Sequence, residues 1–185
     1  MELIERLAAR VRGSEPRLGP VRLVCIDGPA GSGKTTLAGR LAAELGPELE
    51  ARVLLVDELL EGWGGLHTVW PRVQEGVLDN LAQGRPGQYR PYDWVAEEFA
   101  AEDREVPVPD VLVLEGCGSA RRAVDGVAVL KIWVEAPQDL RLARGMARDG
   151  EALRPQWLAW MVDEAALFAA EDTRARADVI VPGDR

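Results

Sequence analysis

The stretch that decides the fold is IDGPAGSGKTTLA, residues 26–38. Four of its residues have the spacing G-x-x-x-x-G-K-[ST], namely Gly28, Gly33, Lys34 and Thr35. The apolar run before it, residues 21–26, is typical of a buried strand, and residues 36–45 after it are typical of a helix. A strand, a glycine-rich loop and a helix in this order predict a loop whose backbone N–H groups surround a phosphate.

The residues of this loop also indicate its chemistry. Glycines let the backbone curl so that N–H groups point inward, and the helix that begins at about Lys34 adds the positive end of its dipole. Lys34 supplies a mobile charge for the outer phosphates, and the Thr35 hydroxyl is suited to ligate Mg²⁺. We therefore expect the phosphates of a nucleotide to be bound by Gly28, Ala30, Gly31, Ser32, Gly33, Lys34, Thr35 and Thr36.

Composition narrows the class of protein. A chain of 185 residues suits one core, and a net charge of −9 argues against nonspecific binding to nucleic acid or to an anionic membrane. No apolar run is long enough to cross a bilayer, and Glu2 and Glu5 argue against a signal peptide. With Cys25 and Cys117 interpreted as reduced packing residues, we expect a cytoplasmic protein without nucleic acid polymers or membranes as partners.

Apolar runs typical of strands alternate with helical patterns along the chain. Strands are predicted at residues 21–26, 52–56, 111–114, 127–134 and 177–181. Helices are predicted at residues 2–12, 36–45, 66–83, 92–102, 137–146 and 155–170, the last with an apolar side made of Trp157, Leu158, Met161, Ala165 and Phe168. The alternation predicts an α/β fold of three layers, α/β/α, around a five-stranded, mostly parallel sheet.

Two acids follow predicted strands. Asp57 comes after residues 52–56 and Glu115 after residues 111–114. Because ligands of open α/β sheets bind beyond the carboxyl ends of the strands, both acids are candidates for the active edge, with Glu115 facing the metal. The alternatives are that Asp57 is a solvated loop acid or a cap, and that Glu115 caps a helix.

Three arginines share one face of the helix predicted at residues 137–146 and just beyond. Arg141, Arg144 and Arg148 are spaced by three and four residues. They form either a solvated basic face or a row of charges beside a bound triphosphate, and in an acidic protein we favour the second interpretation.

Three classes of phosphate-loop protein compete. A GTPase needs an Asn-Lys-x-Asp guanine reader, and the single asparagine, Asn80, is followed by Leu81. A mechanical ATPase usually has Asp-Glu after its third strand, whereas this chain has Glu115-Gly116. A small-molecule kinase needs an acid near the acceptor hydroxyl and a lid with arginines, and this chain has candidates for both.

From about Val21 to Gly183 the sequence resembles the uridine kinase branch of the phosphate-loop nucleoside and nucleotide kinases. Asp57 falls at the acid of the family's Asp-x-Phe-Tyr motif. Residues 92–94, Tyr-Asp-Trp, resemble the family's Tyr-Asp-Phe segment, and residues 113–116 resemble the strand that ends in Phe-Glu-Gly. Residues 141–149 resemble the lid pattern Arg-Leu-x-Arg-Arg-x-x-Arg-Asp, and residues 177–182 resemble the final strand.

The resemblance implies an ATP-dependent kinase that uses Mg²⁺. It implies catalytic roles for Lys34, Asp57, Arg144 and Arg148, nucleotide contacts by Arg141, and a metal held by Thr35, Asp57 and Glu115. It implies an acceptor site at Asp57, Tyr92, Trp94 and Glu97. We expect residues 1–20 to form a helix and linker, and residues 21–185 to form the kinase domain with a short lid around residues 145–155.

The departures from the family pattern concern the acceptor. Leu60 stands where the family has a tyrosine, Glu97 where it has the histidine that reads the pyrimidine, and Gly145 where it has a lid arginine. A nucleoside is the expected acceptor. A nucleoside monophosphate, a sugar or a vitamin precursor stays open, as does a nucleotide-binding protein without turnover. The chain is expected to be a monomer or a homodimer.

Overall fold

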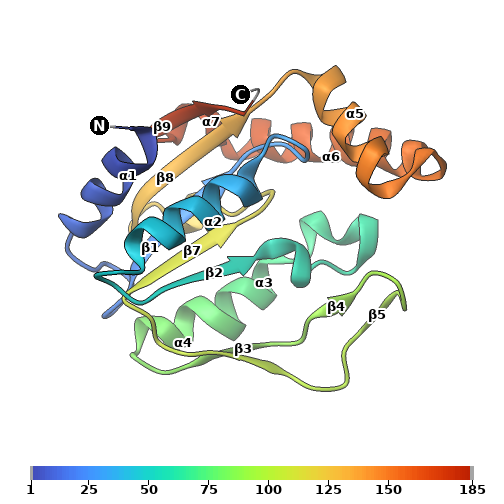
Figure 1. Cartoon of the computed structure of the whole chain (residues 1–185). Coiled ribbons are helices and arrows are strands. Elements are labelled where there is room, and N and C mark those ends of the chain that lie inside the picture. The colour runs from blue at the N-terminus through green and yellow to red at the C-terminus, as the bar shows by residue number, and fades with distance from the viewer. Residues whose placement is uncertain (1, 184–185) are drawn as a thin grey trace.

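One five-stranded sheet forms the centre of the chain, for which the computed structural model describes residues 2–183 (Figure 1). Its strands are β1 Arg22–Asp27, β2 Ala51–Leu55, β7 Val111–Glu115, β8 Ala128–Glu135 and β9 Val179–Pro182. They lie in the order β2-β7-β1-β8-β9, and every neighbouring pair is parallel. The predicted three-layer α/β/α fold with five strands is therefore confirmed.

Side chains of β1 alternate between the two faces of the sheet. Val24 and Ile26 belong to one buried cluster, while Leu23 and Cys25 belong to the other. This alternation follows from the two-residue repeat of a strand, and both faces are apolar because helices cover both.

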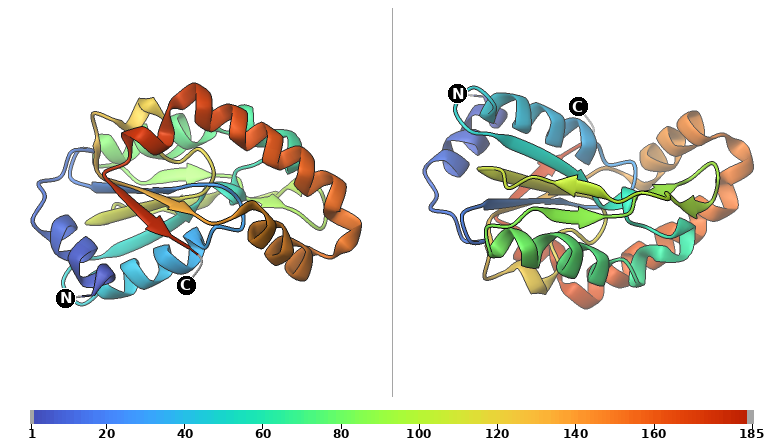
Figure 2. Two further views of the ribbon diagram at one scale, coloured as in Figure 1. Left: turned by 90° about the horizontal axis from the view of Figure 1, so that it is seen from above. Right: turned by 90° about the horizontal axis from the view of Figure 1, so that it is seen from below.

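Different helices cover the two faces (Figure 2). α1 Leu3–Arg12 and α2 Lys34–Leu45 pack on the face of Val24 and Ile26. The other face is covered by α3 Trp70–Val73, α4 Asp79–Ala82 and α6 Arg154–Glu171, followed by the short α7 Thr173–Arg176. The prediction of an N-terminal helix packed on the body is confirmed.

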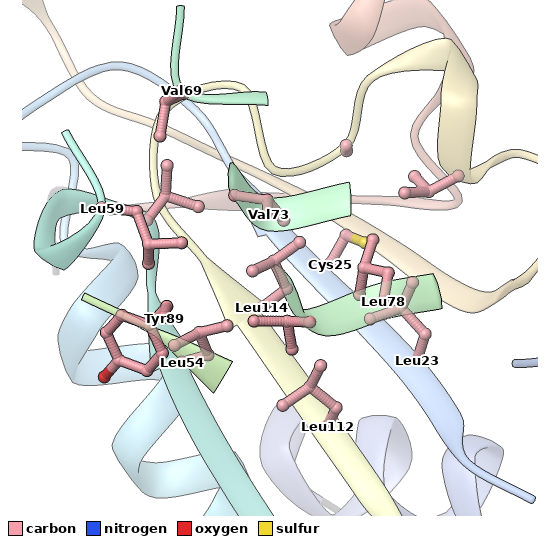
Figure 3. Packing of buried hydrophobic residues seen from close by; sticks show 14 of the residues in the cluster. Leu23, Cys25, Leu54, Leu59, Val69, Val73, Leu78, Tyr89, Leu112 and Leu114 are labelled. Carbon is pink, nitrogen blue, oxygen red and sulfur yellow. The ribbon is translucent and has the colours of Figure 1, made fainter. Parts of the chain in front are cut away.

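The second face shows how strand and helix side chains meet in the core (Figure 3). Leu23, Leu112 and Leu114 of the sheet belong to the same cluster as Val73 and Leu78, which come from the helical segment. A π-helical turn, Gln74–Leu78, joins α3 to α4, so the predicted helix at residues 66–83 exists but begins at Trp70. Residues 62–67 before it form a 3₁₀ helix.

The predicted helix at residues 92–102 is wrong. Here β4 Tyr92–Asp93 and β5 Glu98–Phe99 pair antiparallel, and a second pair joins β3 Gly87–Tyr89 to β6 Arg104–Val106. Aromatic and β-branched residues favour strands, and the Asp93 side chain accepts the N–H groups of Val95 and Ala96 to make the turn. We call residues 87–106 the β-ribbon.

α5 Gln138–Asp149 and the start of α6 project past the carboxyl ends of the strands (Figures 1 and 2). The predicted lid around residues 145–155 falls on this pair, which the 3₁₀ helix Glu151–Leu153 connects. The Trp157 ring lies against Gly145, where an added Cβ would be 2.5 Å from ring atoms. A glycine at position 145 thus lets α5 and α6 approach closely.

The inward side of α6 differs from the predicted one. Leu158 is 43% exposed and Ala165 is also exposed, whereas Trp157, Trp160 and Leu167 are buried. The buried side also includes one charged residue, Glu164.

Among residues 2–183, no helix is both long enough and apolar enough to span a bilayer.

Removing buried side-chain volume from α2 should destabilise the whole chain. Leu41 is fully buried between α2 and the sheet, so Leu41→Ala should lower the free energy of unfolding by about 2 to 5 kcal/mol. Urea denaturation measures this change, with Val162→Ala as the control because Val162 is 68% exposed. A similar loss in both variants would contradict the packing described.

Candidate active site

The loop between β1 and α2 curls under tight steric limits. Gly28 has a φ of 140°, and a Cβ added there would lie 2.1 Å from the carbonyl oxygen of Val134. Gly33, which has a φ of 99°, caps the N-terminus of α2. Since the first N–H groups of a helix have no acceptor within the helix, the start of α2 offers donors and a positive dipole end to an anion.

Lys34 lies in the first turn of α2 and is almost completely buried. Its ammonium donates to the carbonyl oxygen of Pro29 at 3.1 Å and lies 3.7 Å from the Cys117 sulfur. Burial acts to lower the pKa of Lys34, but the nearby Cys117, Glu115 and Asp57 raise it above its usual value. The amine therefore stays positively charged at neutral pH.

Thr35 and Glu115 meet beside this lysine. The Thr35 hydroxyl donates to a Glu115 carboxylate oxygen at 3.2 Å. Burial raises the pKa of Glu115 to about 7, with Lys34 opposing the rise and Asp57 adding to it. The pair offers two oxygen ligands to a hard cation such as Mg²⁺.

Asp57 completes the group of charges at this edge of the sheet. It lies in the 3₁₀ turn Val56–Glu58 that follows β2, and its residue surface is exposed. Surrounding protein atoms raise the pKa of its carboxyl group, while Lys34 and then Arg148 lower it. The charge of Asp57 in turn raises the pKa of Lys34, Glu115 and Arg148, so Asp57 lies close enough to interact with these three groups.

The side chains fit a magnesium ion only together with other ligands. Among residues 2–183, no group of three or more His, Cys, Asp or Glu residues could hold a metal ion. Magnesium is usually held by one or two carboxylates together with water and substrate phosphates. Thr35, Glu115 and Asp57 supply oxygen atoms of this kind, so the residues fit a magnesium nucleotide better than a bare metal ion.

Asp27, at the end of β1, is a site residue that the sequence interpretation missed. Its fully buried carboxylate accepts the N–H groups of Gly28 at 2.7 Å, Gly118 at 2.9 Å and Ala120 at 2.8 Å. Burial raises its pKa to about 6, against the lowering effect of these bonds. An acid that directly precedes Gly28 at the end of an apolar strand was the available signal.

Two of the three predicted phosphate arginines bind the loop itself. Arg141 donates to the carbonyl oxygen of Ala30 at 3.2 Å and forms a buried ion pair with Glu164 at 2.8 Å. Arg144 donates to the carbonyl oxygens of Gly31 at 3.1 Å and Gly183 at 2.9 Å. These contacts favour a role in holding the loop over the direct phosphate contact that we expected.

Arg148 occupies a different position. It is exposed, binds Asp149 through two nitrogens, and lies with its guanidinium carbon 5.7 Å from the centroid of the Trp157 ring. It is also close enough to lower the pKa of Asp57. Of the three arginines, Arg148 is the one whose charge affects Asp57.

The loop residues differ in what remains available to a ligand. The N–H of Ala30 is donated to Glu164 at 2.8 Å. The Ser32 hydroxyl is buried and has no hydrogen-bond partner within residues 2–183. Thr35 and Thr36 are exposed at the start of α2. The structure thus places the candidate phosphate donors around the first turn of α2, beyond Ala30.

Aromatic side chains gather next to Asp57. The Trp94 indole donates to the backbone oxygen of Asp57 at 3.1 Å, and the Trp94 ring lies 5.5 Å from Tyr92 and 5.8 Å from Trp63. Trp63 also contacts the rings of Trp157 and Trp160. This aromatic wall, residues Trp63, Tyr92 and Trp94, joins the β-ribbon to α6.

Glu97 does not share this arrangement. It lies in the exposed turn of the β-ribbon with a φ of 56°, a left-handed conformation that shapes the turn between β4 and β5. Trp63, by contrast, lies within the aromatic wall, although its sequence neighbourhood gave no sign of a role.

Comparison with known proteins gives a family match over part of the chain. The family model described as "Phosphoribulokinase / Uridine kinase family" matches residues 73–157, somewhat less than half of the chain. A search of the curated proteins finds no match. The match with a family of kinases bears out the expected class of enzyme.

Solved structures share the fold across nearly the whole chain. A possible uridine kinase from Bacillus stearothermophilus is 19% identical, with a TM-score of 0.70 and 96% of each chain covered. A candidate fructose transport system kinase from Silicibacter sp. TM1040 is 23% identical, with a TM-score of 0.67, covering 98% of this chain and 100% of its own. At these identities the likeness shows the fold, and with the family match it confirms the predicted resemblance to uridine kinase-like phosphate-loop kinases.

The raised pKa of Glu115 predicts how stability depends on pH. The folded chain keeps the Glu115 proton up to about pH 7, whereas the carboxyl group ordinarily loses it near 4.5. The free energy of unfolding should therefore fall as pH rises between these values, by about 3 kcal/mol from this group alone. Glu115→Gln stays neutral and should remove this part, as urea denaturation at pH 5 and pH 8 would measure. An equal pH dependence in the variant would contradict the assignment.

Proposed function

We propose that this protein is an ATP-dependent kinase that transfers the terminal phosphoryl group to a hydroxyl of a small acceptor, most simply a nucleoside. The observation that carries the proposal is the curled loop that leads into α2, where Lys34 bonds the loop, Thr35 donates to Glu115 at 3.2 Å, and Asp57 is close enough to affect both charges. These residues come from three segments that begin or end at the same edge of the sheet. Ligands of open α/β sheets bind at such an edge.

The proposed division of labour follows from charge. Lys34 and the N-terminus of α2 bind the nucleotide phosphates, and Thr35, Glu115 and Asp57 are the candidate ligands of Mg²⁺. When bound, Mg²⁺ neutralises charge on the phosphate oxygens during transfer. The protein otherwise acts mainly by placing the reactants and by stabilising charge.

Asp57 is the proposed partner of the acceptor hydroxyl. It orients the hydroxyl and accepts its proton late in the transfer. Its raised pKa suits this role because a base works best when its pKa lies nearer the working pH. Arg148, whose charge acts on Asp57, is the proposed group that stabilises the negative charge of the transferred phosphoryl group.

The aromatic wall supports a flat acceptor. Trp94 is 39% exposed and is fixed beside Asp57 by its indole hydrogen bond, so its ring can stack on a base. A sugar is the second candidate, because Glu97 stands in an exposed turn at the position where the family has the histidine that reads the pyrimidine, and because the fold is shared with a candidate fructose transport system kinase. Aromatic rings also pack on the apolar faces of sugars.

A panel of acceptors tests the proposal. ADP formation from ATP and Mg²⁺ is measured with nucleosides, nucleoside monophosphates, sugars and pantothenate. Stimulation by a nucleoside supports the first candidate, and stimulation by a sugar supports the second. Tight ATP binding with no stimulation by any compound would contradict a kinase and favour a nucleotide-binding protein.

Asp57→Asn separates chemistry from nucleotide binding. The variant keeps the shape of the side chain but cannot accept the proton, so turnover should fall about a hundredfold or more while ATP affinity stays nearly unchanged. Steady-state kinetics and equilibrium titration with ATP measure the two quantities. Unchanged turnover would exclude Asp57 from the mechanism.

A further inference from the structure

We propose that Glu164 is a positioning residue that, together with Arg141, sets the shape of the phosphate-binding loop. This inference rests on the proposed function only in that the loop binds a nucleotide. Neither residue needs to touch the nucleotide. Their effect reaches it through the backbone of Ala30, and we call Glu164 and Arg141 the loop brace.

The Glu164 side chain is buried, with only 1% of the residue exposed, and both of its carboxylate oxygens accept hydrogen bonds. One carboxylate oxygen accepts the N–H of Ala30 at 2.8 Å and the indole N–H of Trp160 at 3.0 Å, with the Cys117 sulfur at 3.5 Å. The other accepts from Arg141 at 2.8 Å. A buried carboxylate with this many donors stays where they hold it.

Arg141 binds the same peptide segment as Glu164. Its guanidinium donates to the carbonyl oxygen of Ala30 at 3.2 Å and to that of Ala136 at 3.2 Å. The N–H of Ala30 is thus bound by Glu164, and the carbonyl oxygen of Ala30 is bound by Arg141. Because a peptide unit is planar, this fixes the orientation of the backbone that leads into Gly31.

The neighbouring residues of the loop are held in the same way. The Cys117 thiol donates to the carbonyl oxygen of Gly28 at 3.4 Å, and Arg144 donates to that of Gly31 at 3.1 Å. The outer limb of the loop, residues 28–31, is therefore bonded to side chains outside it. The N–H groups that remain available to phosphates follow residues 28–31 in the chain. The position of residues 28–31 therefore decides where these N–H groups point.

The brace also ties the lid helices to the loop. Arg141 lies on α5 and Glu164 on α6, and both bind Ala30. A movement of α5 relative to α6 would break the buried ion pair between Arg141 and Glu164, whereas a joint movement of the two helices would carry the loop with it. Removing one partner of such a pair leaves the other charge buried and unpaired, which is strongly unfavourable.

Glu164→Gln is the direct test. A glutamine side chain has only one acceptor oxygen. Its NH₂ group must therefore point at Arg141 or at the Ala30 N–H, and the hydrogen bond on that side is lost. We expect the dissociation constants of both ADP and ATP to rise at least tenfold, measured by equilibrium titration with the full chain. Asp163→Asn, a change of the neighbouring acid on the same helix, is the matched control and should leave both constants unchanged.

Arg141→Lys distinguishes the brace from direct phosphate binding. Lysine keeps the positive charge for Glu164 but cannot bond Ala30 and Ala136 at the same time as a guanidinium does. The brace predicts equal weakening of ADP and ATP. Weakening of ATP alone would instead indicate a contact with the terminal phosphate and would overturn the proposal, as would unchanged affinities in a folded Glu164→Gln variant.

Hydrogen exchange gives a readout that needs no nucleotide. In the free protein the Ala30 amide should exchange at least tenfold faster in Arg141→Lys and Glu164→Gln than in the unchanged chain, while amides in β1 should not. Slow exchange of Ala30 in both variants would overturn the brace. Failure of every acceptor in the panel would remove the kinase proposal but leave this result standing, so the two proposals fail separately.

Discussion

The structure depends on how a partly buried, sharply curled loop satisfies its backbone hydrogen bonds. Parallel strands bring the loop after β1 between the ends of β7 and β8, where Gly28 is buried and residues 29–31 are half-buried. Buried N–H and C=O groups need partners, and here charged side chains provide them. The Asp27 carboxylate accepts N–H groups from the segments that follow β1 and β7, and the Glu164 carboxylate accepts an N–H group from the loop. The loop is therefore shaped as much by the acids behind it as by its own glycines.

The same edge of the sheet collects charges that would repel one another without Lys34. Glu115 and Asp57 each raise the pKa of the lysine, and the lysine lowers the pKa of each acid. Burial works against the charged form of all three. A cluster balanced in this way gains from a bound cation, because a divalent ion relieves the repulsion between the two carboxylates. The arrangement is thus suited to a ligand that brings its own metal and its own negative charge.

The sequence was sufficient for the fold, because buried parallel strands and a phosphate loop leave clear local signals. The motif and the strand ends also indicated Lys34, Thr35, Asp57 and Glu115, which the structure brings together. Interpretation failed where local patterns conflict with tertiary context. Residues 92–102 resemble a helix in spacing, yet they form a hairpin packed on aromatic rings. Glu164 follows Trp157 and Trp160 at helical spacing on an otherwise apolar side, a signal that assigning Leu158 and Ala165 to that side obscured.

A motif fixes the spacing of side chains but not the partners that they choose. Arg141, Arg144 and Arg148 do lie on one side of α5, as their spacing indicates. Two of them nevertheless bond carbonyl oxygens of the loop, and Arg148 remains as the arginine near Asp57. Gly145, in place of a further arginine, admits the Trp157 ring against α5. Helices α5 and α6 therefore pack closely at position 145, where the family pattern has a charged side chain.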